Sequence, residues 1–190
     1  MVNASNSLPK SILASPFIWL AVVIIAIGTG YVFWPSGGEN KIPGGLIPGK
    51  NVTSKINTIP SAGATHLRSG EKFSYPDSYP TSGPHEDADF NTGFHKKPLP
   101  PTRIVHALEH GNIVLHYDEP SAEVMTSLRQ WAVLYTNPWS GVIVTRKPGL
   151  GKSIVLTAWT KRLTLPSYEK TAVTKFIHSF RGRGPKRPKR

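Results

Sequence analysis

The sequence contains no cysteine among its 190 residues. Disulfide bonds and thiolate metal ligands are therefore excluded, and any metal site must use histidine, carboxylate or methionine side chains. The absence does not identify a compartment, because many exported bacterial domains also lack disulfides.

Acidic residues are also scarce, with 11 Asp and Glu against 23 Lys and Arg and a formal net charge of +12. The imbalance is concentrated at the C-terminus, since residues 172–190 carry seven Lys and Arg and no acid. Residues 63–171 are nearly neutral. A basic tail can bind nucleic acid, anionic lipid or an acidic protein face through the same Coulombic attraction.

Charge is missing altogether from the 18 residues 17–34. A helix of that length spans about 27 Å, close to the hydrocarbon core of about 30 Å. We therefore expect a transmembrane helix over 16–34. A cleaved signal peptide has a shorter apolar core and small residues at its cleavage site, and a small domain cannot bury a helix that is apolar all round. The residues expected to anchor the helix at its ends are Phe17, Trp19, Tyr31 and Trp34.

Glycine and proline divide the rest of the chain. A short tail, 1–15, precedes the expected membrane helix, and a Gly/Pro-rich linker, 35–62, follows it. Residues 63–180 are expected to form the folded domain, and 181–190 a basic tail. The domain begins with an arm, 63–104, whose repeated prolines exclude a long helix and favour extended segments.

Regular periodicity begins after this arm. β-branched runs predict strands at 113–117, 141–146 and 153–159. Helical spacing of apolar residues predicts one helix that starts at 118–120 and another capped by Ser167. The glycines of 147–152 indicate a hairpin turn between the second and third strands. The order β-α-β-β-α predicts an α+β fold in which a small mixed sheet packs with two helices.

Two short motifs place three of the seven histidines beside turn-forming residues. They are Tyr-Pro-Thr-Ser-Gly-Pro-His at 79–85 and His-Ala-Leu-Glu-His-Gly at 106–111. His106 and His110 are four residues apart, a spacing that puts them on one side of a helix or a strand. With His85 they could bind zinc or copper, and Glu109, Asp87, Glu86 and Asp89 could support these ligands through hydrogen bonds.

Other chemistry is weighed against this hypothesis. The histidines could instead form a structural hydrogen-bond network, or act in catalysis with Glu109 as a proton acceptor. Ser82 lacks the Gly-x-Ser-x-Gly elbow of a hydrolase nucleophile. The segment 149–153 is similar to part of a phosphate-binding loop, but Arg146 replaces its first glycine and a strand follows instead of a helix.

The two motifs resemble the paired signature of a bacterial family, domain of unknown function 3105, over residues 63–188. Leu-Thr-Ala-Trp at 156–159 and the segment from Phe176 to Pro185 extend the resemblance. The family implies an N-terminal anchor or signal and an exported domain, so we expect the N-terminus inside and the domain on the periplasmic side. It implies no activity.

These features predict a membrane-anchored accessory subunit, not an enzyme, whose exported domain binds a larger respiratory or photosynthetic complex. The rival hypothesis is a histidine-based metal-binding protein or metalloenzyme. A nucleic-acid-binding role conflicts with the membrane anchor. The basic residues expected to contact a partner subunit or lipid are Arg181, Arg183, Lys186, Arg187, Lys189 and Arg190.

Overall fold

The described residues, 55–88 and 90–186 of a computed structural model, contain a six-stranded mixed sheet and three helices, so the predicted α+β class is confirmed. All of them belong to one compact unit, Leu46–Arg190. The strands are β1 (Ile56–Thr58), β2 (Gly93–His95), β3 (Ile113–Tyr117), β4 (Val142–Arg146), β5 (Ile154–Ala158) and β6 (Lys161–Leu165). The helices are α2 (Pro101–Glu109), α3 (Ala122–Leu134) and α4 (Lys170–Phe180).

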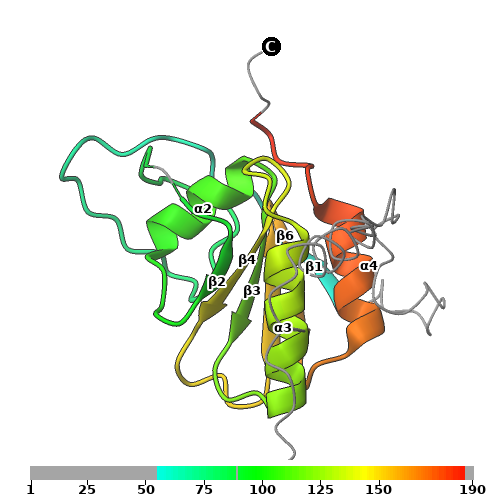
Figure 1. Ribbon diagram of the computed structural model, residues 1–190. Coiled ribbons are helices and arrows are strands. Elements are labelled where there is room, and N and C mark those ends of the chain that lie inside the picture. The colour runs from blue at the N-terminus through cyan, green and yellow to red at the C-terminus, as the bar shows by residue number, and fades with distance from the viewer. Residues whose placement is uncertain (1–54, 89, 187–190) are drawn as a thin grey trace, which may run out of the picture. The chain divides into compact units, whose positions relative to one another are not determined.

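The strand order is β1-β6-β5-β3-β4-β2 (Figure 1). β2, β4 and β3 are parallel, whereas β5, β6 and β1 continue the sheet in antiparallel fashion. β3 lies between β4 and β5, and all of its residues are buried. A continuous β-branched and aromatic run is typical of a strand buried on both faces.

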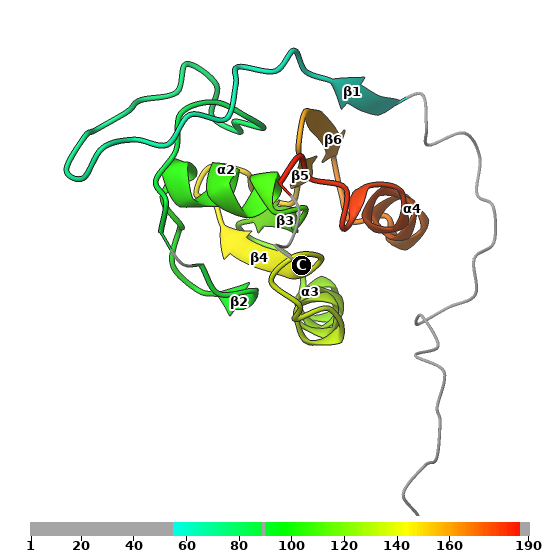
Figure 2. The same cartoon turned by 90° about the horizontal axis from the view of Figure 1, so that it is seen from above.

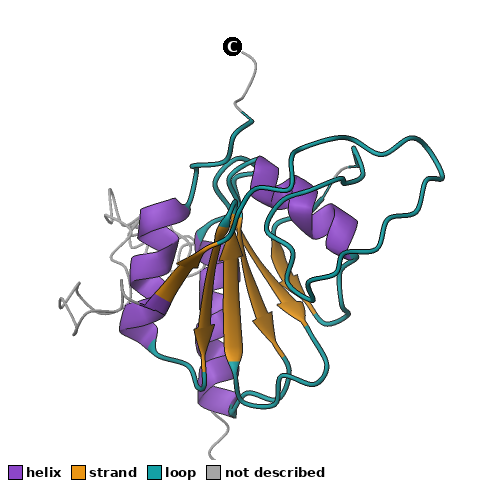
Figure 3. Ribbon diagram, turned by 180° about the vertical axis from the view of Figure 1, so that it is seen from behind, coloured by secondary structure: helices purple, strands orange, loops and turns teal. Residues whose placement is uncertain are grey.

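The helices cover the two faces of the sheet unequally. Figure 2 shows α3 and α4 on one side, and α2 with the proline-rich arm on the other. Figure 3 views the second side, where loops cover part of the sheet that helices leave open. The arm and α2 therefore lie on the same face of the sheet, where their side chains can meet.

Each helix packs through an apolar stripe. α3 buries Leu128, Trp131 and Ala132, and α4 buries Ala172, Val173, Phe176 and Ile177. These are the residues that helical spacing selected, except that Val124 and Phe180 are only partly buried. On the other face Ile104, Ala107 and Leu108 of α2 pack against Val114 and Ile143. Burial of each large apolar side chain contributes about 1.5–3 kcal/mol to the stability of the fold. These contacts therefore hold α2 against the sheet.

The predicted hairpin at 147–152 is wrong, because β4 and β5 do not pair and β3 lies between them. The segment instead crosses the end of β3. Lys147 donates its N–H to the Tyr117 carbonyl (2.6 Å), and the carboxylate of Asp118 accepts from the Gly149 N–H (2.9 Å) and the Arg146 Nε (3.1 Å). Composition alone indicates a turn but not which strands it separates.

The number of helices and their starts also differ from the prediction of two. α2 was not predicted because Pro100 and Pro101 indicate extended chain, yet Pro101 occupies the first helical turn, where its missing N–H costs nothing. α3 begins at Ala122 after Ser121, whose hydroxyl accepts the Val124 N–H, and not at 118–120. α4 begins at Lys170 with Glu169, not Ser167, before it.

Several predictions fall outside the described residues. The expected membrane helix, 16–34, is one of them, as are Arg187, Lys189, Arg190 and Asp89. Within the described ranges no helix has the length and apolar character needed to cross a membrane. β1 pairs with β6 and lies within 35–62, the stretch that the sequence predicts as a linker.

Candidate metal centre

The end of α2 presents two of the site residues. His106 and Glu109 are three residues apart, so they project from the same side of the helix. The helix stops because Gly111 has a positive φ of 92°, and the N–H groups of Gly111 and Asn112 bond back to the Leu108 and Ala107 carbonyls. Such a closing motif favours glycine, which has no Cβ to clash in this conformation.

The arm supplies two more residues from segments that pair with each other. His66 and His85 form an isolated parallel bridge: the Leu67 N–H donates to the His85 carbonyl (2.8 Å), and the His85 N–H donates to the Thr65 carbonyl (3.0 Å). The bridge sets the two imidazole rings side by side, with their centroids 4.9 Å apart.

The turn before His85 is fixed by hydrogen bonds. Gly83, with φ 120°, donates its N–H to the Gly63 carbonyl (2.8 Å), and the buried Ser82 hydroxyl accepts the Ala62 N–H (2.8 Å). The Tyr75 hydroxyl donates to the Pro84 carbonyl. The Ser82 hydroxyl thus binds the backbone of the arm, and this contact gives no support to the hypothesis that Ser82 is a nucleophile.

Four side chains converge where these segments meet the helix. The ligand atoms of His66, His85, His106 and Glu109 all lie within 4.8 Å of one another, a grouping that could hold a metal ion. The Glu109 Oε2 atom lies 3.3 Å from the His85 Nε2 and 3.7 Å from the His66 Nε2. His85, His106 and Glu109 are buried, with 0%, 4% and 7% exposure, whereas His66 reaches the surface.

The hydrogen bonding of His85 fixes its proton. Its Nδ1 lies 2.9 Å from the Gly83 carbonyl, which can only accept, so Nδ1 carries the hydrogen in the neutral ring. The Nε2 atom, which then carries no hydrogen, lies 3.3 Å from the Glu109 Oε2. Neither atom has a hydrogen-bond partner among the described residues, nor has the His106 Nδ1. Buried polar atoms are rarely left in this state unless an ion or water joins them.

Burial also keeps His106 neutral. Desolvation, with smaller contributions from the nearby His110, Lys186 and His85, lowers the pKa of His106 to about 4. A neutral imidazole is the form that binds a metal. At neutral pH this residue therefore needs no proton removed before it can act as a ligand.

His110 has a different environment from the one predicted. Its ring stacks on Trp139 at 4.2 Å between centroids and lies 4.5 Å from the His106 ring. The four converging residues do not include it. Of the predicted trio, the structure brings His85 and His106 together, and His66 and Glu109 complete the group.

The predicted acidic neighbours divide between two places. Asp87 lies at the exposed rim, with its carboxylate oxygens 3.5 Å from the His66 Nδ1 and 4.0 Å from the His106 Nε2. Glu86 instead joins the arm to the start of α2, since its carboxylate accepts from Thr102 (2.6 Å) and Arg103 (3.4 Å). The Thr102 hydrogen bond is the main reason that the pKa of Glu86 is lowered.

No sequence motif indicates that His66 belongs to the site. It lies 19 residues before His85 outside any motif, and only the bridge between arm segments brings it to the site. Glu109 was expected to support the ligands and not to be one. Its position three residues after His106 is the pattern that could have indicated a shared ligand role.

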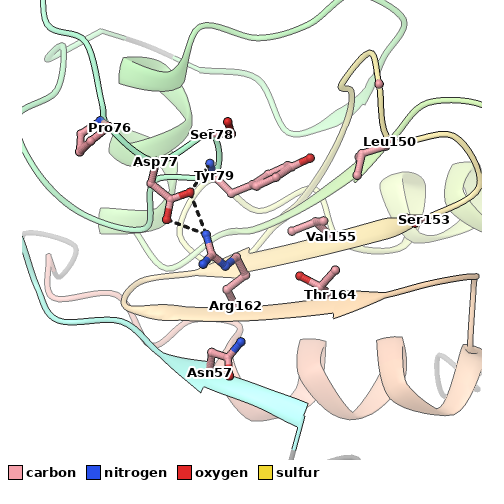
Figure 4. A pocket seen from close by; sticks show the side chains of 11 residues that line it. Asn57, Pro76, Asp77, Ser78, Tyr79, Leu150, Ser153, Val155, Arg162 and Thr164 are labelled. Atoms are coloured by element: carbon pink, nitrogen blue, oxygen red, sulfur yellow. Dashed lines mark hydrogen bonds and ion pairs between the residues drawn. The ribbon is translucent and has the colours of Figure 1, made fainter.

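The surface of the described residues includes two wide grooves. One, of about 730 Å³, runs along residues 65–71 with Phe73 and Pro84, and His66 forms part of its wall. The other, of about 790 Å³, contains none of the four converging residues. Figure 4 shows it between Tyr79 and Leu150, with the Arg162 guanidinium bonded to both oxygens of Asp77 at 2.8 and 2.6 Å.

The basic residues of the C-terminal segment differ in their contacts. The Arg181 guanidinium donates to the Ser140 carbonyl (2.8 Å) and lies 4.0 Å from the centre of the Tyr135 ring. Arg183 is exposed, and the Lys186 ammonium lies 3.6 Å from the Glu109 Oε2. Among the described basic residues of this segment, Arg181 and Lys186 therefore already have partners within the domain, whereas Arg183 is exposed.

Fold and site together define an α+β protein with a buried histidine and carboxylate cluster between one helix and an extended arm. The chain belongs to the family described as protein of unknown function (DUF3105), whose model matches residues 66–190. The match includes all four residues of the cluster. No curated protein and no solved structure matches the chain.

Proposed function

We propose that this protein binds a divalent metal ion, preferentially zinc, through His66, His85, His106 and Glu109. One observation carries the proposal: the His85 Nε2 and the Glu109 Oε2 are buried, lack hydrogen-bond partners among the described residues and lie 3.3 Å apart. Two lone pairs at this distance repel unless a proton or a metal cation lies between them, and a metal ion would also bring the other two side chains into contact with the same centre. The Gly83 carbonyl on Nδ1 is the type of partner that orients a metal-binding histidine.

The spacing of the donor atoms suits tetrahedral zinc. Zinc bonds of about 2.0–2.1 Å at tetrahedral angles separate neighbouring ligand atoms by about 3.3–3.4 Å. The two distances from the Glu109 Oε2, 3.3 and 3.7 Å, are close to this value. The four ligand atoms lie within 4.8 Å of one another, so zinc binding would draw these side chains closer together.

The donor types favour zinc over copper. Three imidazoles and a carboxylate match the nitrogen and oxygen ligands of zinc sites, whereas copper(I) prefers thiolate or thioether sulfur and copper(II) prefers a tetragonal arrangement. Copper(II) still binds imidazole tightly. It is therefore the competing metal in any test.

Zinc titration of the metal-free, full-length protein against a chromophoric chelator tests the proposal. We expect one zinc per chain, and a loss of affinity of about 100-fold or more for His85→Ala and Glu109→Ala, because each removes a direct ligand. The matched control is His110→Ala, which changes a neighbouring, partly buried histidine outside the cluster and should keep affinity within about threefold.

Two results would refute the proposal. One is a wild-type protein that binds neither zinc nor copper(II). The other is an equal loss for His110→Ala and His85→Ala, which would indicate general damage. Added zinc should also raise the melting temperature, since a ligand that binds only the folded state stabilises it by mass action. This increase should vanish in His85→Ala.

A further inference from the structure

A cation of the protein itself already lies beside the cluster. The Lys186 ammonium is 3.6 Å from the Glu109 Oε2, the same oxygen that the His85 and His66 Nε2 atoms approach. The Lys186 side chain is 34% exposed, so it enters from the surface and does not form part of the core. Nothing in the metal-binding role requires a positive charge there.

The backbone around Lys186 is docked on the end of α2. The Lys186 N–H donates to the Glu109 carbonyl (3.2 Å), and the Gly182 N–H donates to the Gly111 carbonyl (2.8 Å). Between them Gly184 packs so closely that a Cβ atom would lie 2.1 Å from the Glu109 carbonyl oxygen and 2.4 Å from the Gly111 nitrogen. Lys186 is therefore aimed at the cluster by a fitted segment, 181–186.

The positive charge of Lys186 opposes the binding of a metal ion at this site. A divalent ion bound to the Glu109 Oε2 would lie within a few ångströms of the Lys186 ammonium, and like charges at that separation repel strongly where solvent is limited. Without a metal, the ammonium offsets the charge of a buried carboxylate that would otherwise be costly to bury alone.

We propose that Lys186 sets the affinity of the metal site: its ammonium balances Glu109 in the metal-free protein and is displaced when the ion binds. This inference rests on the proposed function. By thermodynamic linkage, a docked segment 181–186 lowers metal affinity, and bound metal weakens the docking by the same factor. The basic tail would thereby respond to metal occupancy.

Zinc affinity of Lys186 variants in the full-length protein is the test. Lys186→Gln should bind zinc about tenfold more tightly than wild type, because it removes the repelling charge. Lys186→Arg keeps the charge and should stay within about threefold of wild type. The matched control is Lys152→Gln, an exposed lysine on the segment between β4 and β5, which should change nothing.

Gly184→Ala tests the aiming of Lys186 without removing its charge. The added methyl cannot fit against Glu109 and Gly111, so the segment should leave the site and zinc affinity should rise as in Lys186→Gln. In the wild type, saturating zinc should speed tryptic cleavage after Arg183, measured by mass spectrometry of the intact chain. Lys186→Gln should show a smaller effect of zinc on cleavage.

The outcomes separate the two proposals. Equal zinc affinity in wild type, Lys186→Gln and Gly184→Ala would overturn the role of Lys186 and leave the metal site standing. Weaker binding by Lys186→Gln would also overturn it, because the lysine would then support the site. Zinc binding by neither wild type nor Lys186→Gln would overturn both.

Discussion

At the scale of single residues, His85 shows that the sequence around a residue does not indicate the other members of its site. The motif at 79–85 predicts a tight turn that ends in a histidine, and the structure confirms the turn through Ser82 and Gly83. The identity of the atoms facing His85 depends on His66 and on the end of α2, which are distant in sequence. The amino-acid sequence contains the ligand residues but does not indicate that they come together in the folded protein.

His116 provides a prediction at this scale, on how stability depends on pH. This residue is buried in β3, where its Nε2 lies 3.3 Å from the Thr157 hydroxyl, and burial, followed by the charge of Lys147, lowers its pKa to about 3. The unfolded chain, with a histidine pKa near 6.5, binds more protons between these values. Stability from His116 is therefore complete above about pH 6.5 and is lost as the pH falls towards 3.

Urea unfolding at pH 7 and pH 5 with a metal chelator present measures this effect. We expect the wild type to lose about 1–2 kcal/mol between the two pH values from this residue, at about 1.4 kcal/mol for each pH unit below 6.5. His116→Gln should show a shallower dependence, whatever its stability at pH 7. The same slope in both proteins would show that His116 is not the group responsible.

At the scale of elements, Asn112 joins the end of α2 to the segment that precedes β4. Its side-chain amide donates to the Ala107 (2.9 Å) and Pro138 (2.7 Å) carbonyls, and its Oδ1 accepts the Gly141 N–H (2.8 Å). The side chain is completely buried. These bonds hold the end of the helix, and with it Glu109, against the segment that precedes β4.

Asn112→Ala should lower the free energy of unfolding by about 2–4 kcal/mol, because three side-chain hydrogen bonds are lost and the buried Gly141 N–H is left without this acceptor. Zinc affinity should fall as well, since the end of α2 carries two of the ligands. Asn91→Ala, at an exposed position, should stay within about 0.5 kcal/mol. Equal stability of the two variants in chemical denaturation would contradict the role of Asn112.

The elements that sequence periodicity predicts are those with the clearest patterns. β3, β4, β5, α3 and α4 have continuous β-branched runs or apolar residues at helical spacing, and all five are present. β1 and β2 have only three residues each, and prolines disguise the start of α2. The strand order depends on long-range pairing, so no local pattern could place β3 between β4 and β5.

At the scale of the whole molecule, the structure explains part of the positive charge near the C-terminus. Two of the basic residues at the C-terminus have contacts within the domain: Arg181 contacts Ser140, and Lys186 contacts Glu109. Arg183 is exposed and free to meet other molecules through its charge. The partner or lipid role of the remaining tail stays a prediction of the sequence.

The membrane anchor at 16–34 and the accessory-subunit role are also predictions for the whole chain. We expect the native protein to resist carbonate extraction from bacterial membranes, and a mild-detergent purification to yield stoichiometric partner subunits. Deletion of 35–54 or 187–190, which leaves β1 and the docked segment 181–186 in place, should release those partners if linker and tail hold them. A protein extracted by carbonate, or purified alone in every detergent, would contradict these expectations.

Anomalous X-ray diffraction from crystals of the zinc-loaded protein would locate a metal ion at the proposed site. We expect one strong peak at the zinc absorption edge, about 2.0–2.1 Å from the His85 Nε2 and the Glu109 Oε2. His66 and His106 should complete the coordination, and the Lys186 ammonium should have moved away. A cluster without a peak, or a peak held by His110 in place of Glu109, would contradict the proposed metal site.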